Sequence, residues 1–265
     1  MAGDQSTNEQ NYTFYIEEPP INSYVETFFA QYASISSSAL REHLISIRER
    51  AWKKFNYPCL GRWAFLQFAI RQSPIYQEIV DQCRNEDATV IDFGCCLGQD
   101  VRQLIFDGVP LDRIRAYELD SFFIEQGYQL FGDRNRLEEK NTIRQGDIFD
   151  DQFLDKIHPC SYLYVGSFIH LFDSQTQKEV CRRLTRICQG AITGRQVGAT
   201  IPVERARNIG TQEGKMMCHS PASFTQMWEE VTNGEWKVEY AQLNHLDDGE
   251  RLRQMLFFVV RKQNQ

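Results

Sequence analysis

The feature that most constrains the fold is an alternation of short apolar runs with helical patterns, which begins after residues 85–87. The first run, residues 88–93, ends in an acid and leads into a glycine turn. The expected strands are residues 88–93, 114–119, 142–146, 161–167 and 190–196, and the expected helices between them are residues 99–107, 121–131 and 175–189. Because parallel strands need helical crossovers, this pattern predicts an α/β fold with helices on both faces of a parallel sheet.

The last part of the chain has a different pattern. Ser220-Pro221 predicts the start of a helix that ends near Thr232. Residues 236–243 and 254–261 then predict two strands, and their short separation favours an antiparallel pair. The expected fold is therefore a seven-stranded, mostly parallel sheet with an antiparallel last strand. For the helix at residues 175–189, Ser174 and Gln177 predict a capping box.

The sequence before residue 86 divides into two further regions. Residues 1–20 are polar, lack a period and end in two prolines, which predicts a disordered leader. Residues 21–85 show helical periodicity and predict an N-terminal helical cap. Within it, Ser38 is the expected N-cap of a long helix, and Ser73 the expected N-cap before Pro74. Residues 86–265 form the expected ligand-binding domain.

Composition narrows the class of protein. The chain has 265 residues, 42% of them hydrophobic, which is enough to bury a core. Its formal net charge of -7 argues against nucleic acid as a substrate, because phosphate binding needs a dense basic surface. Eight cysteines show no CxxC or metal-ligand spacing, so we expect reduced thiols and no metal site. We see no signal peptide and no run of eighteen apolar residues, and we therefore expect a cytoplasmic protein without a membrane anchor.

Two glycines mark the expected ligand site. In an open parallel sheet the ligand binds outside the carboxyl ends of the strands. Gly94 and Gly98 lie in the first turn at that edge, where missing side chains allow close approach of a ligand to the backbone. A dinucleotide site would favour glycine at the position of Cys96 as well.

Acidic residues follow the next two expected strands. Glu118 is placed to accept hydrogen bonds from two ribose hydroxyls, and Asp147 from the amino group of adenine. Ile148 and Phe149 offer apolar surface to the adenine ring. These positions fit an adenosyl ligand better than a pyrophosphate-bearing dinucleotide.

The motifs at these positions resemble those of a known family. Residues 90–100, 116–120 and 146–149 are similar to motifs I, II and III of the class I S-adenosylmethionine-dependent methyltransferases, and the likeness spans residues 88–262. More narrowly, the sequence at 94–100, together with residues 57–59, 65–66 and 127–131, resembles the small fungal methyltransferases of meroterpenoid and other secondary-metabolite pathways. The resemblance implies a Rossmann-like fold and S-adenosylmethionine as the cofactor.

The resemblance also implies roles for individual residues. Asp92 would face the amino group of the methionine moiety, although a cap of the next turn is the simpler interpretation. Asp120 competes with Glu118 for the ribose, but it also suits the N-cap of the following helix. The residues expected to bind the cofactor are Asp92, Gly94, Cys95, Gly98, Glu118, Leu119, Asp147, Ile148, Phe149 and Ser167. Cys96 departs from the family pattern, because the middle glycine of motif I is more common there and has greater φ freedom.

Three residues are candidates for contact with the acceptor. His170 follows the fourth expected strand, where the family places residues facing the transferred methyl, although a lone histidine in apolar company is usually a core residue. His219 precedes the helix that begins at Ser220-Pro221. Arg195, at the end of the fifth strand, would hold a substrate carboxylate bidentately, or pair with a nearby acid.

The resemblance implies O-methylation of a small molecule. Fungal relatives in meroterpenoid pathways are associated with methyl esterification of a carboxylic acid, which we expect here, and a carboxylate needs no general base. A phenol or hydroxyl acceptor is the first alternative and requires a base such as His170 or His219. A non-catalytic cofactor-binding partner protein is the second. The aromatic helical cap suits a lid over an apolar substrate, and a homodimer through the cap is compatible with the sequence.

Overall fold

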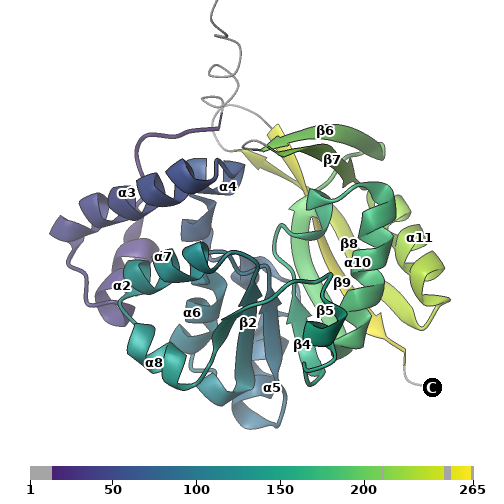
Figure 1. The fold of residues 1–265 in the computed structure, drawn as a ribbon, viewed down its shortest axis with the longest axis horizontal. Coiled ribbons are helices and arrows are strands. Elements are labelled where there is room, and N and C mark those ends of the chain that lie inside the picture. Colours follow the sequence, from purple (N-terminus) through teal and green to yellow (C-terminus); the bar gives the residue numbers. More distant parts are fainter. Residues whose placement is uncertain (1–13, 210–211, 248–251, 264–265) are drawn as a thin grey trace, which may run out of the picture.

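The computed structural model describes residues 14–209, 212–247 and 252–263, and Figure 1 shows its fold. Seven of the described strands form one sheet, in the order β3-β2-β1-β4-β5-β9-β8. These strands are β1 (Val90–Phe93), β2 (Ile114–Glu118), β3 (Ile143–Gln145), β4 (Cys160–Tyr164), β5 (Cys188–Val197), β8 (Trp236–Asp247) and β9 (Leu252–Lys262). Strands β1 to β5 are parallel, and β9 is antiparallel to both β5 and β8. The predicted mostly parallel sheet with an antiparallel last strand is confirmed.

Helices cover both faces of the sheet, as predicted. They are α5 (Tyr76–Asn85), α6 (Gln99–Phe106), α7 (Ser121–Phe131), α8 (Arg134–Glu139), α9 (Asp151–Leu154), α10 (Ser174–Arg186) and α11 (Pro221–Thr232), with short 3-10 turns η3 (Leu111–Arg113) and η4 (Ile169–Leu171). One apolar cluster joins the sheet to α5, α6, α7 and α8, and a second joins its other face to α10 and α11. The side chains of the central strands β1, β2, β4 and β5 alternate between these two clusters.

The N-terminal helices pack against the sheet domain at the glycine turn. They are α2 (Ser23–Tyr32), α3 (Ser37–Lys54) and α4 (Pro58–Gly61), followed by η1 (Ala64–Gln67) and η2 (Ala69–Gln72). Their aromatic and aliphatic side chains form a third apolar cluster, which also contains Leu97 of the glycine turn and Phe131 of α7. Residues 1–13 of the predicted leader lie outside the described residues. Ile16, from its last part, donates its backbone N–H to the carbonyl of Gly61.

Two predicted helix caps in the N-terminal region are wrong. Helix α3 begins one residue before Ser38, and its N-cap is Ser36, which has the extended backbone of a cap residue. Helix α5 begins at Tyr76 rather than directly after Ser73. The hydroxyl of Ser73 forms a hydrogen bond of 2.8 Å with Thr193 of β5, and it accepts a longer one of 3.4 Å from the backbone N–H of Ile75.

The predicted capping box of Ser174 and Gln177 is also wrong. Asp173 is the N-cap of α10, because its side chain accepts a hydrogen bond from the backbone N–H of Thr176. The Gln177 amide donates to the backbone carbonyls of Phe172 and Met217. Its hydrogen bonds therefore connect α10 to another part of the fold.

A β-hairpin between β5 and α11 was not predicted. Its strands, β6 (Val203–Ile209) and β7 (Gln212–Cys218), pair antiparallel and form a separate two-stranded sheet. Hydrogen bonds join the hairpin to the main fold. Among them, the Met217 N–H donates to the Phe172 carbonyl, the Arg207 guanidinium donates to the Leu171 carbonyl, and the Ser174 N–H donates to the Glu204 carboxylate. Figure 1 shows the hairpin and α4 at the same, upper end of the molecule.

The state of the cysteines and the character of the helices bear on the class of protein. All eight cysteines lie in the described part of the chain, none forms a disulfide, and six of them are buried. No helix within the described ranges has the length and apolar character needed to cross a membrane.

Candidate active site

A buried carboxylate lies near the carboxyl end of β1. Asp92 is 2% exposed, and its Oδ2 atom has no hydrogen-bond partner among the described residues. Burial, and then the negative charges of Asp100 and Glu118, raise the pKa of Asp92 well above its ordinary value. Asp100 is also buried, but its Oδ1 accepts the backbone N–H of Ile70 at 2.8 Å. Asp92 is therefore a buried acid with an unused acceptor at the edge where a ligand is expected.

The turn after β1 depends on positive φ angles. Gly94 has φ +76°, and a Cβ there would lie 2.6 Å from the Phe168 ring, so no side chain fits. Cys96 has φ +51°, the left-handed region that a middle glycine would enter without strain. Its backbone N–H donates to Glu118 Oε2 at 2.9 Å, which joins the turn to the end of β2. Sequence analysis noted that glycine would have greater φ freedom than Cys96 at this position, and the structure shows that Cys96 does adopt a positive φ.

The tips of β2 and β3 lie beside this turn. The second oxygen of Glu118 accepts the backbone N–H of Asp120 at 3.1 Å, and burial raises the pKa of Glu118 while these backbone hydrogen bonds oppose the rise. Asp120 is the N-cap of α7, as predicted. Leu119 is 61% exposed. The carboxyl end of β2 thus combines an acid with an exposed apolar side chain.

The segment after β3 contains the other predicted adenine-binding residues. Asp147 accepts the backbone N–H of Phe149 at 2.9 Å. Phe149 is 41% exposed, whereas Ile148 is 3% exposed and packs in the apolar cluster on the α10 side. Of the two predicted apolar residues, Phe149 has the more exposed surface.

The exit of β4 folds back over the glycine turn. Ser167 has φ +57° and donates its N–H to the carbonyl of Arg195 at 2.6 Å. The next residue, Phe168, covers Gly94. His170 lies in η4 and is 7% exposed. These residues close the turn region from the side of β4.

Arg195 is held by the N-terminal helices. The residue is 4% exposed, and its two terminal nitrogens donate to the side-chain oxygens of Gln72 and Gln67 at 2.8 and 2.7 Å. The alternative that Arg195 pairs with an acid is wrong, since both partners are neutral amides. Its positive charge nevertheless acts against the burial that raises the pKa of Asp100.

His219 lies next to the end of β5. Its carbonyl accepts the N–H of Ala199 at 2.9 Å, and its Nδ1 is 2.8 Å from the hydroxyl of Ser223. The ring is buried, and Nε2 has no partner among the residues that the structure describes. Burial, and then the charge of Lys178, lower the pKa of His219 to about 4. The imidazole is therefore neutral at pH 7.

Two residues that sequence analysis did not assign to the site approach it from the cap and the hairpin. Tyr57 is the N-cap residue of α4, and its pKa is raised by burial, then by Cys96 and by Glu118, and lowered by the charge of Arg207. Arg207 donates to the Leu171 carbonyl at 2.7 Å, and its buried Nε has no partner among the described residues. No local motif predicted either residue, because the cap and hairpin meet only in the fold.

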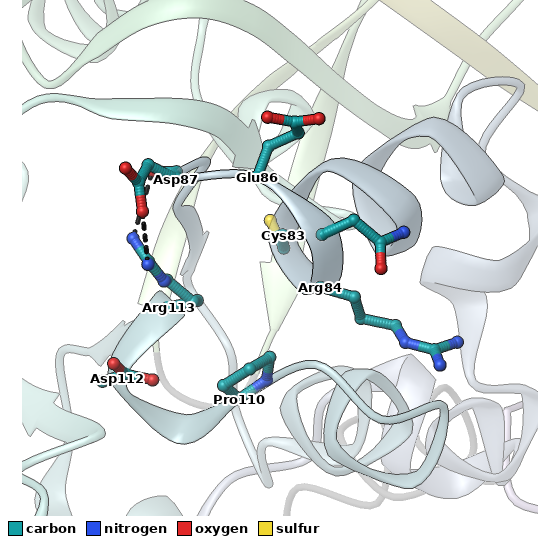
Figure 2. Close-up of a pocket in the computed structure, with 8 residues that line it drawn as sticks. Cys83, Arg84, Glu86, Asp87, Pro110, Asp112 and Arg113 are labelled. Atoms are coloured by element: carbon teal, nitrogen blue, oxygen red, sulfur yellow. Dashed lines mark hydrogen bonds and ion pairs between the residues drawn. The ribbon is translucent and has the colours of Figure 1, made fainter.

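A polar hollow lies at the opposite edge of the sheet. Figure 2 shows its lining, which comes from the end of α5 and the segment before β2. It has a volume of about 330 Å³ and contains an ion pair of 2.6 Å between Arg113 and Asp87. Because these residues precede β1 and β2, the hollow lies at the amino ends of the strands, away from the glycine turn.

Similarity to known proteins establishes the family. Over 250 residues the chain is 34% identical to the O-methyltransferase atr3 of Stereocaulon alpinum, an alignment that covers 90% of this chain and 71% of that protein. The chain belongs to the family of S-adenosylmethionine-dependent methyltransferases that includes this O-methyltransferase. The methyltransferase is also 30% identical to the methyltransferase adrK of Penicillium roqueforti, over 80% of this chain and 77% of that one.

Two further comparisons concern the N-terminal region and the fungal branch. Residues 12–66 of the methyltransferase match the family model described as the meroterpenoid methyltransferase N-terminal domain. Over 92% of its length it is 29% identical to the Asnovolin E/Chermesin D methyltransferase nvfJ of Aspergillus novofumigatus, of which the alignment covers 90%. The predicted likeness to fungal meroterpenoid methyltransferases is confirmed.

Solved structures agree on the fold of the methyltransferase. The DhpI complex with S-adenosylhomocysteine aligns with a TM-score of 0.50 at 14% identity, over 87% of this chain and all of that one. Magnesium protoporphyrin IX methyltransferase (ChlM) from Synechocystis PCC 6803 aligns with the same TM-score at 8% identity, over 91% and 96%. The predicted Rossmann-like fold of class I methyltransferases is confirmed.

Proposed function

We propose that the methyltransferase holds the ammonium group of its cofactor at Asp92. The observation that carries this proposal is the unpartnered, buried Oδ2 of Asp92, which an ammonium donor would satisfy. A cation there also favours the ionised carboxylate, which burial alone disfavours. Gly94 and Gly98 lack side chains on the same turn, so the backbone at Gly94, Cys95 and Gly98 is the remaining surface for the methionine moiety.

The adenosyl part of the cofactor fits the tips of β2 and β3. Both oxygens of Glu118 accept backbone hydrogen bonds, and a carboxylate retains further lone pairs for two ribose hydroxyls. The exposed side chains of Leu119 and Phe149 offer apolar surface for the adenine, with Asp147 near its amino group. Ile148, the residue before Phe149, is buried in the apolar cluster on the α10 side, and Ser167 lies at the turn after β4.

We propose that the acceptor is the carboxylic acid of an apolar secondary metabolite, in the manner of a meroterpenoid intermediate. Arg207 supports an anionic acceptor, because its guanidinium lies on the hairpin beside η4 and retains an unused donor. His219 supports the same choice. With a pKa of about 4 it is a weak base for removing the proton of a phenol, whose ordinary pKa is about 10.

The residues of this chain would act mainly by positioning. When bound, the cofactor supplies a sulfonium methyl group, which a carboxylate oxygen takes as the carbon–sulfur bond breaks, without any proton transfer. Asp92 and Glu118 fix the cofactor, and Phe168 shields the turn from water. Arg207 orients the acceptor. Arg195 holds the end of β5 against the N-terminal helices through its hydrogen bonds to Gln67 and Gln72.

Labelled-methyl transfer to paired acceptors tests this proposal. The pair has one apolar skeleton that carries either a carboxylic acid or a phenol, and we expect label in a methyl ester that mild hydrolysis removes. His170→Ala and His219→Ala should each cost less than about tenfold in kcat for the acid, whereas a required base would cost about a hundredfold or more. Label that resists ester hydrolysis, or appears only on the phenol, contradicts the carboxylic acid proposal.

Arg207 has a matched control on the same strand. Arg207→Ala should raise KM for the acid acceptor, and Arg205→Ala, two residues away and exposed, should not. Neither change should alter the affinity for S-adenosylhomocysteine. An equal effect of the two variants on KM means that general surface charge, rather than Arg207, attracts the acceptor.

A further inference from the structure

A fully buried arginine holds the glycine turn by hydrogen bonds to its backbone. Arg102 of α6 has 0% exposure, and its guanidinium forms a two-pronged ion pair with Asp133, with distances of 2.9 and 2.8 Å. The same guanidinium donates to the backbone carbonyls of Leu97 and Gly98 at 3.0 and 3.2 Å. Arg102 therefore joins the cofactor turn directly to the residue that precedes α8.

The network continues into the N-terminal helices. Tyr32, the last residue of α2, donates its hydroxyl to Asp133 Oδ2 at 2.8 Å. Burial, and then the charge of Asp133, raise the pKa of Tyr32, so the hydroxyl stays protonated and remains a donor. Its ring lies edge-on to Phe131, with 6.1 Å between ring centroids. A continuous chain of polar contacts thus runs from α2 through Asp133 and Arg102 to the turn.

The turn packs closely against Arg102 and α7. A Cβ on Gly98 would lie 2.3 Å from the Arg102 guanidinium, and a Cβ on Gly127 of α7 would lie 2.3 Å from the Leu97 carbonyl oxygen. Because a peptide unit is planar, a fixed Leu97 carbonyl also fixes the direction of the Gly98 N–H, which donates to the Cys95 carbonyl at 2.7 Å inside the turn. In the same way, the Gly98 carbonyl fixes the N–H of Gln99. Arg102, together with the hydrogen bond from Gly98 to Cys95, therefore holds the backbone of the turn on which the proposed cofactor site is built.

We propose that Tyr32, Asp133 and Arg102 are positioning residues that couple the packing of α2 to the affinity for the cofactor. The inference rests on the cofactor site proposed above and extends it to three residues that do not touch the cofactor. Loss of the network leaves the binding residues in place but allows the Leu97 and Gly98 peptides to rotate. Affinity for the cofactor then falls without a direct contact being removed.

The fold contains a second triad of tyrosine, carboxylate and arginine, which is more exposed than the first and serves as the control. Tyr162 of β4 donates to Glu78 of α5 at 2.8 Å, and Arg261 of β9 donates to both oxygens of Glu78 at 3.0 and 3.2 Å. Tyr162 pairs with Val90 at the beginning of β1, so this triad lies toward the amino ends of the strands. It links a helix to the sheet, whereas the first triad links helices to one another, and none of its hydrogen bonds reaches the glycine turn.

The test compares cofactor affinity and stability in variants of both triads. The Arg102→Met/Asp133→Leu double variant removes the donors without leaving an unpaired buried charge, and such replacements are commonly tolerated. We expect it to weaken binding of S-adenosylhomocysteine by about tenfold in calorimetry, and Tyr32→Phe to weaken binding by about twofold to threefold. Tyr162→Phe and Arg261→Met/Glu78→Leu should leave this affinity unchanged.

Two further readouts separate positioning from general destabilisation. In the Arg102→Met/Asp133→Leu variant, KM for the cofactor should rise while KM for the acceptor is retained. By linkage, the cofactor should protect α2 from hydrogen exchange more in the wild type than in this variant. The inference is overturned if variants of the two triads lose equal affinity for S-adenosylhomocysteine at equal loss of Tm. It is also overturned if neither Tyr32→Phe nor the Arg102→Met/Asp133→Leu variant loses affinity. Absence of binding by the wild type instead contradicts the proposed cofactor site.

Discussion

The backbone N–H of Cys96 donates to a carboxylate oxygen of Glu118 across 2.9 Å. This hydrogen bond connects the turn after β1 to the residue that we propose holds the ribose. It exists because Cys96 adopts φ +51°, a conformation that costs a non-glycine residue about 1–2 kcal/mol. The geometry of the proposed cofactor site therefore depends on the strained backbone of Cys96, and not on its side chain.

Replacement of Cys96 tests this dependence. Cys96→Gly should keep the affinity for S-adenosylhomocysteine within about threefold, because relief of the strain offsets the greater chain entropy of glycine in the unfolded state. Cys96→Val should weaken binding by about tenfold or more, since a β-branched side chain strongly disfavours positive φ. Calorimetric titration of both variants measures the difference. Similar affinities for the glycine and valine variants contradict the role assigned to the Cys96 backbone.

Asp92 gives a prediction about pH. Its pKa in the folded protein is raised, so folding favours the protonated acid. The stability that the protonated acid contributes is complete below the unfolded pKa of about 3.9. It is lost as the pH rises through the raised folded pKa. Asp92→Asn should therefore raise the Tm of the ligand-free protein at pH 7. The same change should weaken binding of S-adenosylhomocysteine by about tenfold to a hundredfold, because a hydrogen bond to a charged group is lost.

The pH profile of binding provides the control for Asp92. In the wild type, affinity should increase with pH until the pH passes the raised pKa of Asp92 in the ligand-free protein, because the ammonium group selects the ionised carboxylate. In Asp92→Asn that dependence should be much flatter. Parallel profiles in the two proteins show that another group titrates and contradict the proposed role.

His219 contributes an acid-sensitive part of the stability. Its folded pKa of about 4 lies below the unfolded value of about 6.5, so the contribution is complete above pH 6.5 and is lost as pH falls toward 4. His219→Gln should remove up to about 3 kcal/mol of this acid destabilisation. Urea unfolding of wild type and variant at pH 7 and pH 4.5 checks it. An unchanged difference in unfolding free energy between the two pH values contradicts the buried, neutral histidine.

Local patterns in the sequence were sufficient for the main features of the fold. Helix α7 was predicted with the bounds that the structure shows, because its N-cap Asp120 and its apolar spacing are both local signals. The order of acids at consecutive strand tips predicted where Asp92 and Glu118 lie, since parallel strands end at one edge of the sheet. These predictions used only residues close together in the sequence or related by the regular alternation.

The features that were missed depend on distant partners. Strand β6 contains Glu204, Arg205 and Arg207 among its seven residues, so its apolar period is too weak to predict a strand. Tyr32 contacts Asp133 across a separation of 101 residues, and Ser73 contacts Thr193 across 120, and no local motif indicates either pair. The predictions for Ser73 and Gln177 failed for a related reason, because each side chain also hydrogen-bonds to a distant part of the fold.

The most direct test of the proposed site is thermal unfolding with S-adenosylhomocysteine in the wild type and in the Asp92→Asn/Glu118→Gln variant. At a ligand concentration one hundred times the wild-type Kd, binding stabilises the fold by about 2.7 kcal/mol. The wild-type Tm should then rise by roughly 5–10 °C, whereas the variant should show a much smaller rise at the same concentration. No rise in the wild type, or an equal rise in the variant, contradicts a cofactor site built on Asp92 and Glu118.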